Sequence, residues 1–242
     1  MPGQQNLGSE RGKRAEEVAS WYFRLNGFLT IPGFVVHPDQ LRRFPRTEAD
    51  LLGVRFPYSR EFISDRQMND DALLAGIDNS GHRTVFVLVE VKTDLCNING
   101  PWSNRDEKNV HRVLRRLGFA EESLVNEIAE SMYDTARWED GATVLQYVCV
   151  GARKNDGKQR QFPNLVQINW SEVAEFLWAR FAAFPEKLPD GRPVHEQWPD
   201  FGQEYGEWVN RMRYANAQPA DTNVRSLSAV SSYISSGSCV PA

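Results

Sequence analysis

The sequence predicts an α/β fold, because strongly apolar strands alternate in it with amphipathic helices. Residues 84–92 and 142–151 are nearly continuous apolar runs rich in valine, which are typical of strands covered on both faces. Residues 12–25 carry apolar side chains at steps of three and four with charged residues between them, the pattern of an amphipathic helix. We therefore expect a central sheet flanked by helices.

The N-terminal half supplies three further elements. The first helix ends at Gly27, since glycine suits the left-handed position after a last helical turn. Residues 28–36 are β-branched and aromatic but are interrupted by a proline and a glycine, so we expect an edge strand. Asp50 opens a short apolar strand, and the turn-rich residues 56–83 form an insertion that contains a short helix or strand at 71–77.

The C-terminal half alternates helices and strands. Its predicted elements are helices at 107–120 and 121–138, the strand at 142–151, a basic loop at 153–160, a strand at 165–170, a helix at 172–184 with Ser171 as N-cap, and a last helix at 201–214. Ser, Ala and Thr dominate from residue 217 onward and aromatic residues nearly vanish, which predicts a disordered tail. The expected organisation is one domain over residues 1–216, followed by this tail over residues 217–242.

The composition and the charge exclude some classes of function. The 242 residues include 28 Lys and Arg against 32 Asp and Glu, a net charge of −4. This excludes a globally basic nucleic-acid binder but leaves room for a local basic groove. No stretch approaches the roughly 18 apolar residues of a membrane span, and the first residues lack the apolar core of a signal peptide, so we expect a cytoplasmic protein without a membrane partner. The three cysteines are far apart and the glycines form no phosphate-binding loop, so neither a disulfide framework nor ATP or NAD use is indicated.

The strand at 84–92 carries the main anomaly. Side chains alternate between the two faces of a strand, so Glu90 and Lys92 share one face at the end of a buried run. Two surface charges at the point where a strand emerges into solvent would give the same pattern. Three acidic residues upstream add to the pair, and they are Glu16 on the first helix, Glu48, and Asp50 at its strand entrance.

The order of these residues resembles a known family. Gly12-Lys-Arg-Ala-Glu16, Glu48-Ala-Asp50 and Val89-Glu90-Val-Lys92 follow one another as in the PD-(D/E)XK nuclease superfamily, and most of all as in its Holliday-junction resolvases, Mrr-type restriction enzymes and YraN-type proteins. The resemblance covers residues 12–93. The chain departs from the compact members in the long stretch between Asp50 and Glu90 and in the region after residue 93.

The resemblance implies a restriction-endonuclease-like core with a mixed central sheet, an insertion and C-terminal helical additions. It implies a nuclease that uses Mg²⁺ or Mn²⁺ to hydrolyse phosphodiester bonds, with DNA favoured over RNA, in DNA repair, restriction or anti-phage defence. Asp50, Glu90 and the backbone carbonyl of Val91 would hold the metal ion. Lys92 would orient or deprotonate the attacking water and offset charge on the phosphate, and Glu16 would bind a metal-coordinated water or a second ion. Glu48 is an expected outer participant.

Basic residues on both sides of this set are candidates for phosphate contacts, and they are Arg42, Arg43, Arg46, Arg112, Arg115, Arg116, Arg153 and Lys154. Such charged runs are also typical of solvated surfaces. Three alternatives stay open: a structural ion-pair network around Glu90 and Lys92, a non-catalytic nucleic-acid-binding or protein-interaction module on the same fold, and a defence nuclease against RNA or DNA that needs a partner. A homodimer is also left open.

Overall fold

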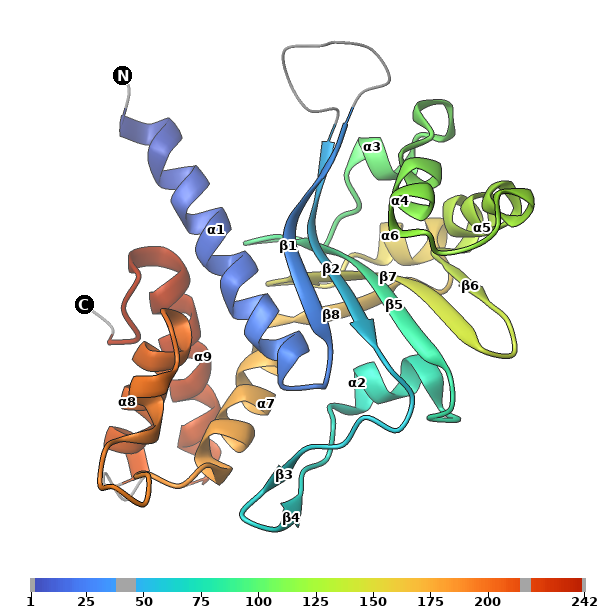
Figure 1. Ribbon diagram of the computed structural model, residues 1–242. Helices are drawn as coiled ribbons and strands as arrows, with labels where there is room; N and C mark the ends of the chain where they lie inside the picture. Colours follow the sequence, from blue (N-terminus) through green and yellow to red (C-terminus); the bar gives the residue numbers. More distant parts are fainter. Residues whose placement is uncertain (1–2, 38–46, 214–218, 241–242) are drawn as a thin grey trace.

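A mixed six-stranded β-sheet forms the centre of the computed structural model, as expected (Figure 1). The structure describes residues 3–37, 47–213 and 219–240. The strands lie in the order β1-β2-β5-β7-β6, and β8 also pairs with β7. Their bounds are β1 Leu29–Val36, β2 Thr47–Arg55, β5 Thr84–Val91, β6 Arg137–Glu139, β7 Thr143–Gly151 and β8 Val166–Asn169.

Strand β5 lies in the middle of this sheet. It pairs antiparallel with β2, which pairs antiparallel with the edge strand β1. On its other side β5 pairs parallel with β7, which pairs parallel with β8 and antiparallel with β6. The carboxyl ends of β5, β7 and β8 therefore lie at one edge of the sheet. The central place of residues 84–91 and the edge place of residues 29–36 confirm the predictions for these two strands.

Helices cover both faces of the sheet (Figure 1). One layer consists of α1 (Gly3–Arg24), α7 (Trp170–Ala183), α8 (Phe201–Arg213) and α9 (Pro219–Ser236), and the other of α3 (Gly100–Ser103), α4 (Asn109–Leu117) and α5 (Glu122–Thr135). The short helix α6 (Asp156–Gln161) follows β7, and the 3-10 helices are η1 (Gly76–Asp78), η2 (Arg105–Glu107) and η3 (Val194–Gln197). The valines of β5 pack in the hydrophobic core under the layer of α1, and Leu88 packs in the core under the layer of α4, as the alternation predicts. None of the helices in the described ranges combines the length and the apolar composition that crossing a membrane requires.

Residues 56–83 leave the sheet between β2 and β5, as expected of an insertion. They form a small hairpin of β3 (Phe62–Ile63) and β4 (Arg66–Gln67), the helix α2 (Ala72–Ala75) and η1. The buried Arg180 of α7 fastens this segment, because its guanidinium donates at 2.7 Å to the carbonyls of both Leu25 and Asn69 and pairs with Glu61. The insertion is therefore tied to the α7 layer.

The prediction of a disordered tail at 217–242 is wrong for the residues that the structure describes there. Helix α9 packs on α7 and α1, and side chains such as Val230 and Tyr233 are buried in the core of that layer. Even a serine of α9 is buried, since the Ser226 hydroxyl donates to the carbonyl of Ala174 at 2.6 Å. The segment is rich in serine, but its apolar side chains recur at helical spacing and form one apolar face of α9.

Three smaller predictions also need correction. The second predicted helix ends early, at Thr135, because the residues after it pair with β7 as β6. The basic loop at 153–160 contains α6. The N-cap of α7 is Asn169, whose side chain accepts from the N–H of Glu172 at 2.9 Å while the Glu172 carboxylate accepts from the Asn169 N–H at 2.7 Å. This capping box leaves Ser171 inside the first turn.

Candidate active site

The sheet splits at the carboxyl end of β5. Strand β2 pairs with β1 from Thr47 to Val54, but it pairs with β5 only from Leu51 onward. Asp50 therefore lies inside β2, where the two strands separate, and does not open a strand as predicted. Glu90 is the residue that a continued antiparallel register would place opposite Asp50. We call this point of separation the fork.

Three of the predicted catalytic residues are in contact at the fork. Lys92 Nζ lies 2.7 Å from Glu90 Oε2 and 3.4 Å from Asp50 Oδ2. Asp50 Oδ2 also accepts a hydrogen bond of 2.7 Å from the backbone N–H of Val91. A continued antiparallel ladder would direct this N–H to the backbone of β2 instead. The structure thus brings Asp50, Glu90 and Lys92 together from two strands.

Both backbone groups of Lys92, its N–H and its carbonyl, are hydrogen-bonded. Its N–H donates to the carbonyl of Val150 in β7 at 2.8 Å, and its carbonyl accepts from the indole N–H of Trp170 at 3.2 Å. Trp170 is the first residue of α7 and is buried, so its indole N–H needs a partner inside the protein. Strand β7 and helix α7 therefore fix the point from which the Lys92 side chain starts. No local pattern in the sequence marks Trp170 as a partner of Lys92.

Glu90 is buried beside another carboxylate. Only 2% of the residue is exposed. Burial, and then the negative charge of Asp50, raise the pKa of Glu90 to about 7, although Lys92 opposes this shift. Near neutral pH the carboxyl is therefore close to half protonated, and a second cation would favour its ionised form.

Two buried polar atoms near Glu90 have no hydrogen-bond partner within the described part of the chain. They are Glu90 Oε1 and the indole Nε1 of Trp102, on α3. The Trp102 indole lies where its N–H can act as a hydrogen-bond donor to Glu90 and lower the pKa of this carboxyl, behind the larger effects of burial, Asp50 and Lys92. Buried polar atoms usually find partners, so this pair marks a place where a ligand or a small movement would complete the bonding. Nothing in the sequence pointed to Trp102.

Glu16 approaches the same point from α1. Burial, followed by the charges of Asp50 and Glu48, raises the pKa of Glu16 to about 7, and Lys92 acts in the opposite direction. Glu48 is exposed on β2. Because the charges of both Asp50 and Lys92 affect its pKa, Glu16 on the first helix lies within electrostatic range of the fork.

The fork offers a small set of metal donors. Among the residues that the structure describes, no group of three or more His, Cys, Asp and Glu side chains is arranged to hold a metal ion. Asp50 and Glu90 supply two carboxylates, and the carbonyl of Val91 faces the same side of β5 as the N–H that Asp50 binds. Mg²⁺ keeps several waters and needs only one or two protein carboxylates. The unpartnered Glu90 Oε1 and this oxygen-only donor set therefore fit Mg²⁺ or Mn²⁺.

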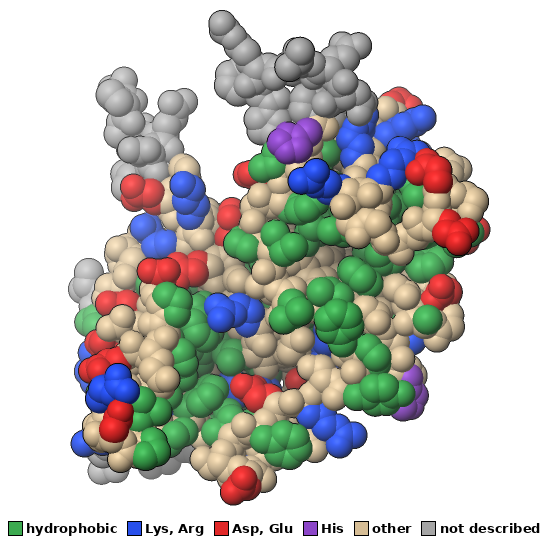
Figure 2. Space-filling model, in the orientation of Figure 1, with side chains coloured by type: hydrophobic (Ala, Val, Ile, Leu, Met, Phe, Trp, Pro, Cys, Tyr) green, Lys and Arg blue, Asp and Glu red, His purple; other side chains and the backbone are tan. Residues whose placement is uncertain are grey.

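The predicted phosphate-contacting residues differ in their surroundings. Arg42, Arg43 and Arg46 lie outside the described residues. Three others are already in ion pairs, namely Arg115 with Glu122, Arg153 with Asp94 and Lys154 with Glu172. Arg112 donates to the carbonyl of Glu107, and Arg116 is exposed on α4. Figure 2 shows Lys and Arg side chains together at the upper right, over the part of the molecule that α3 and α4 occupy in Figure 1.

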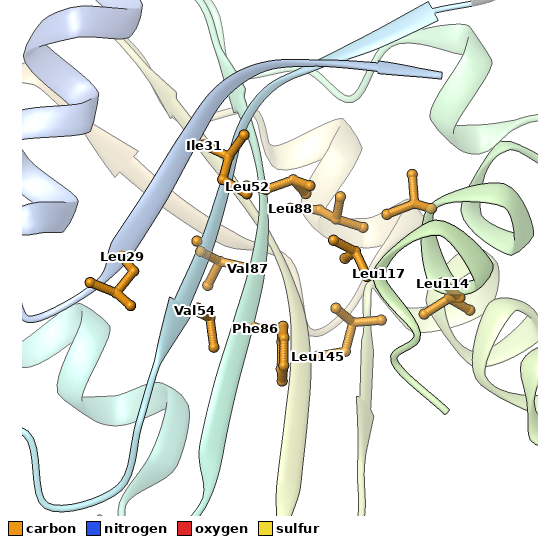
Figure 3. A pocket seen from close by; sticks show the side chains of 12 residues that line it. Leu29, Ile31, Leu52, Val54, Phe86, Val87, Leu88, Leu114, Leu117 and Leu145 are labelled. Carbon is orange, nitrogen blue, oxygen red and sulfur yellow. The ribbon is translucent and has the colours of Figure 1, made fainter. Parts of the chain in front are cut away.

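An apolar pocket of about 60 Å³ lies between the sheet and α4 (Figure 3). Its lining comes from β1, β2, β5, β7 and α4 and includes no titratable side chain among the described residues. Leu29 and Ile31 of the edge strand are more than half exposed at this pocket, at 63% and 52%. Such a pocket has no group for acid–base or metal chemistry. The candidate active site is therefore the fork.

In comparisons with known proteins, no family model, no curated protein and no solved structure matches this chain. The function must therefore be inferred from the chemistry of the fork.

Proposed function

We propose that this protein is a metal-dependent nuclease that hydrolyses phosphodiester bonds, with DNA as the favoured substrate, on a restriction-endonuclease-like core. The contact of Lys92 with both Glu90 and Asp50 carries the proposal. These residues come from two strands that the insertion separates along the chain. Their contact supports the proposal, and so does the effect of Asp50 and Lys92 on the pKa of Glu16 on the first helix.

The charges at the fork suit this chemistry. Hydrolysis of a phosphodiester needs an attacking water and relief of negative charge in the transition state, and a bound Mg²⁺ or Mn²⁺ supplies both. Asp50, Glu90 and the Val91 carbonyl would hold the ion, since the carboxylates crowd one another and gain from a cation. Glu16 would accept a hydrogen bond from a water at the margin of the site.

Lys92 would act through its positive charge. Burial lowers the pKa of Lys92, but its attraction to Glu90 and Asp50 outweighs burial, so the pKa is raised and the side chain is an ammonium at neutral pH. An ammonium has no lone pair with which to accept a proton from water, but it donates hydrogen bonds to phosphate oxygens. This favours charge compensation and orientation of the water over its deprotonation.

Exposed basic side chains would bind the sugar–phosphate backbone. The ion pairs of Arg115, Arg153 and Lys154 lie at the surface, where such pairs contribute about 0–1 kcal/mol. These side chains can therefore exchange a carboxylate for a phosphate at little cost. Binding of this kind depends on salt and only weakly on base sequence.

One observation favours a second candidate, a non-catalytic binding or interaction module on the same fold. Lys92 already neutralises part of the charge on Asp50 and Glu90, and the described residues hold no larger group of metal-binding side chains. A purely structural ion-pair network would have these features too. The two candidates differ in whether a metal ion changes the protein and whether phosphodiester bonds are cut.

The deciding experiment incubates the purified chain with supercoiled, linear, single-stranded and branched DNA and with RNA, in Mg²⁺ or Mn²⁺ and in EDTA. The variants are Asp50→Asn, Lys92→Ala and, as a control, Glu175→Gln at an exposed position of α7. A nuclease of the proposed kind needs the metal and loses at least about a hundredfold in rate in the first two variants but not in the control. Cleavage that survives both Asp50→Asn and Lys92→Ala would assign the activity elsewhere, and nucleic-acid binding without any cleavage would favour the binding module.

A further inference from the structure

A pocket of about 290 Å³ lies next to the candidate active site, and one of its walls is helix α9. We call it the α9 pocket. Its polar lining consists of Arg11 of α1, Thr93 after β5, Ser171 in the first turn of α7, and Ser231 and Ser235 of α9. With Ala152, which follows β7, the pocket is built by five segments that are far apart in the sequence.

Two residues connect the α9 pocket to the fork. Thr93 follows Lys92 directly in the chain, and Trp170, which also lines the pocket, donates its indole N–H to the Lys92 carbonyl at 3.2 Å. The pocket thus lies at the edge of the sheet where β5, β7 and β8 end, which is where open α/β sheets generally bind ligands. A group bound there would therefore lie close to the backbone of Lys92.

The lining of the α9 pocket suits a phosphate. The hydroxyls of Thr93, Ser231 and Ser235 and the guanidinium of Arg11 can donate hydrogen bonds into it. The Ser171 hydroxyl already donates to Asn169 Oδ1 at 2.5 Å, so it could only accept a bond there. No carboxylate is among the described lining residues of the pocket. Arg11 is exposed and has no ion-pair partner among the described side chains, unlike Arg153 and Lys154. Guanidinium and hydroxyl groups are common donors to phosphate oxygens. The apolar side chains of Leu227 and Ile234 complete the wall and would contact a sugar.

Helix α9 is fixed firmly enough to serve as a wall. Arg14 of α1 donates to the carbonyls of Ile234 at 3.0 Å and Ser235 at 2.8 Å. These carbonyls belong to the last turn of α9, where the helix itself provides no donors. Figure 1 shows α9 beside α1 in the same layer. The pocket is therefore formed before any ligand arrives, as binding pockets usually are.

We propose that the α9 pocket binds a phosphate, together with its sugar, of the nucleic-acid strand that is cut at the fork. The inference rests on the proposed nuclease function and names a substrate-binding role for α9, which lies outside the region that resembles the superfamily. An internal phosphodiester and a terminal phosphate monoester share the chemistry that this lining recognises. The first would let the enzyme act within strands, and the second would direct it to strand ends.

The test measures the affinity of fluorescent oligothymidylates by anisotropy in EDTA, where no metal-dependent cleavage occurs. Arg11→Gln should weaken binding about five- to tenfold and reduce the slope of log affinity against log salt by about 0.7, the value for one phosphate of a single strand. Ser231→Phe should fill the pocket and weaken binding at least about tenfold. The matched controls are Arg24→Gln, at an exposed position near the other end of α1, and Val224→Phe, at a position of α9 that is 71% exposed.

Each outcome bears on the proposal. If the wild type binds and neither Arg11→Gln nor Ser231→Phe changes affinity beyond its control, the α9 pocket is not a phosphate site, while the nuclease function still stands. If the wild type neither binds nor cleaves any nucleic acid, the proposed function itself fails.

Oligothymidylates with a 5′-phosphate, a 3′-phosphate or only hydroxyl ends distinguish a terminal phosphate from an internal one as the bound group. If a terminal phosphate raises the affinity of the wild type and Arg11→Gln removes that increase, the pocket binds strand ends. If the three oligothymidylates bind with equal affinity and both Arg11→Gln and Ser231→Phe reduce it, the pocket binds internal phosphates. Circular-dichroism melting checks that Ser231→Phe is folded.

Discussion

The burial of Glu90 at the fork makes folding depend on pH. The pKa of Glu90 rises from 4.5 to about 7 on folding, because burial and the charge of Asp50 disfavour its ionised form. One pKa unit corresponds to about 1.4 kcal/mol, so ionising Glu90 costs the folded protein about 3 kcal/mol. Between these two pKa values the folded state binds more protons than the unfolded state. The stability that protonated Glu90 contributes is therefore fully present below about pH 4.5 and is lost as the pH rises through about 7.

Glu90→Gln tests this directly, since glutamine keeps the size of the side chain and stays neutral. Urea unfolding of the wild type and of Glu90→Gln would be compared from about pH 4.5 to about pH 8 without metal. The free energy of unfolding of the variant, relative to the wild type, should increase by about 3 kcal/mol across this range. Glu16 titrates in the same direction in both proteins, so its contribution largely cancels from the difference. Glu175→Gln, at an exposed position of α7, should give a difference that does not change with pH.

A difference between Glu90→Gln and the wild type that stays constant with pH would refute the argument, because Glu90 would then not be buried against Asp50. Addition of Mg²⁺ extends the test to the proposed function. At a concentration about 100 times its Kd the ion should stabilise the wild type by about 2.7 kcal/mol and raise Tm by roughly 5–10 °C near pH 8. The same addition near pH 5 should have little effect, since protonated carboxyls bind the ion weakly.

Three further predictions concern the supports of the site. Deletion of residues 217–242 should remove several buried side chains worth about 1.5–3 kcal/mol each, so the truncated chain should unfold or precipitate, and retention of the wild-type Tm would contradict the packing of α9. Arg180→Met should lower the free energy of unfolding in urea by about 2–4 kcal/mol, because two backbone carbonyls lose their buried donor. Trp102→Phe should weaken Mn²⁺ binding in calorimetry about tenfold by removing a donor beside Glu90, while Trp138→Phe, whose indole bonds to a glutamate at the surface, should not.

The sequence was sufficient for the parts of the fold that follow from local periodicity. The alternation in residues 84–92 placed Glu90 and Lys92 on one face, and the structure confirms both the alternation and the contact. Only the resemblance predicted that Asp50 would lie close to Glu90 and Lys92. The insertion between β2 and β5 contains no sequence pattern that would align these two strands. The buried partners Trp102 and Trp170 were missed, since a tryptophan in a four-residue helix or at a helix start has no periodic context.

The failures have a common physical cause, which is that tertiary partners decide the state of locally ambiguous segments. The serines of α9 suggested disorder, yet Ser226 can be buried because its hydroxyl donates a hydrogen bond to the carbonyl of Ala174. Residues 137–139 continued a helical pattern but became β6, since the free edge of β7 offers backbone hydrogen bonds. The partners of Arg153 and Lys154 could not be named either, because Asp94 and Glu172 are distant in the chain.

The fork itself follows from the charges that it holds. If β2 continued to pair with β5 beyond Leu51, Asp50 and Glu90 would face one another as directly opposed like charges, which destabilises a sheet. Separation of the strands relieves that repulsion and leaves the N–H of Val91 without a backbone partner on β2. The Asp50 carboxylate takes this N–H, and the ammonium of Lys92 lies between the two acids. The same residues therefore account for the separation of the strands, satisfy the backbone N–H that it exposes, and leave two carboxylates at the place where the proposed metal ion would bind.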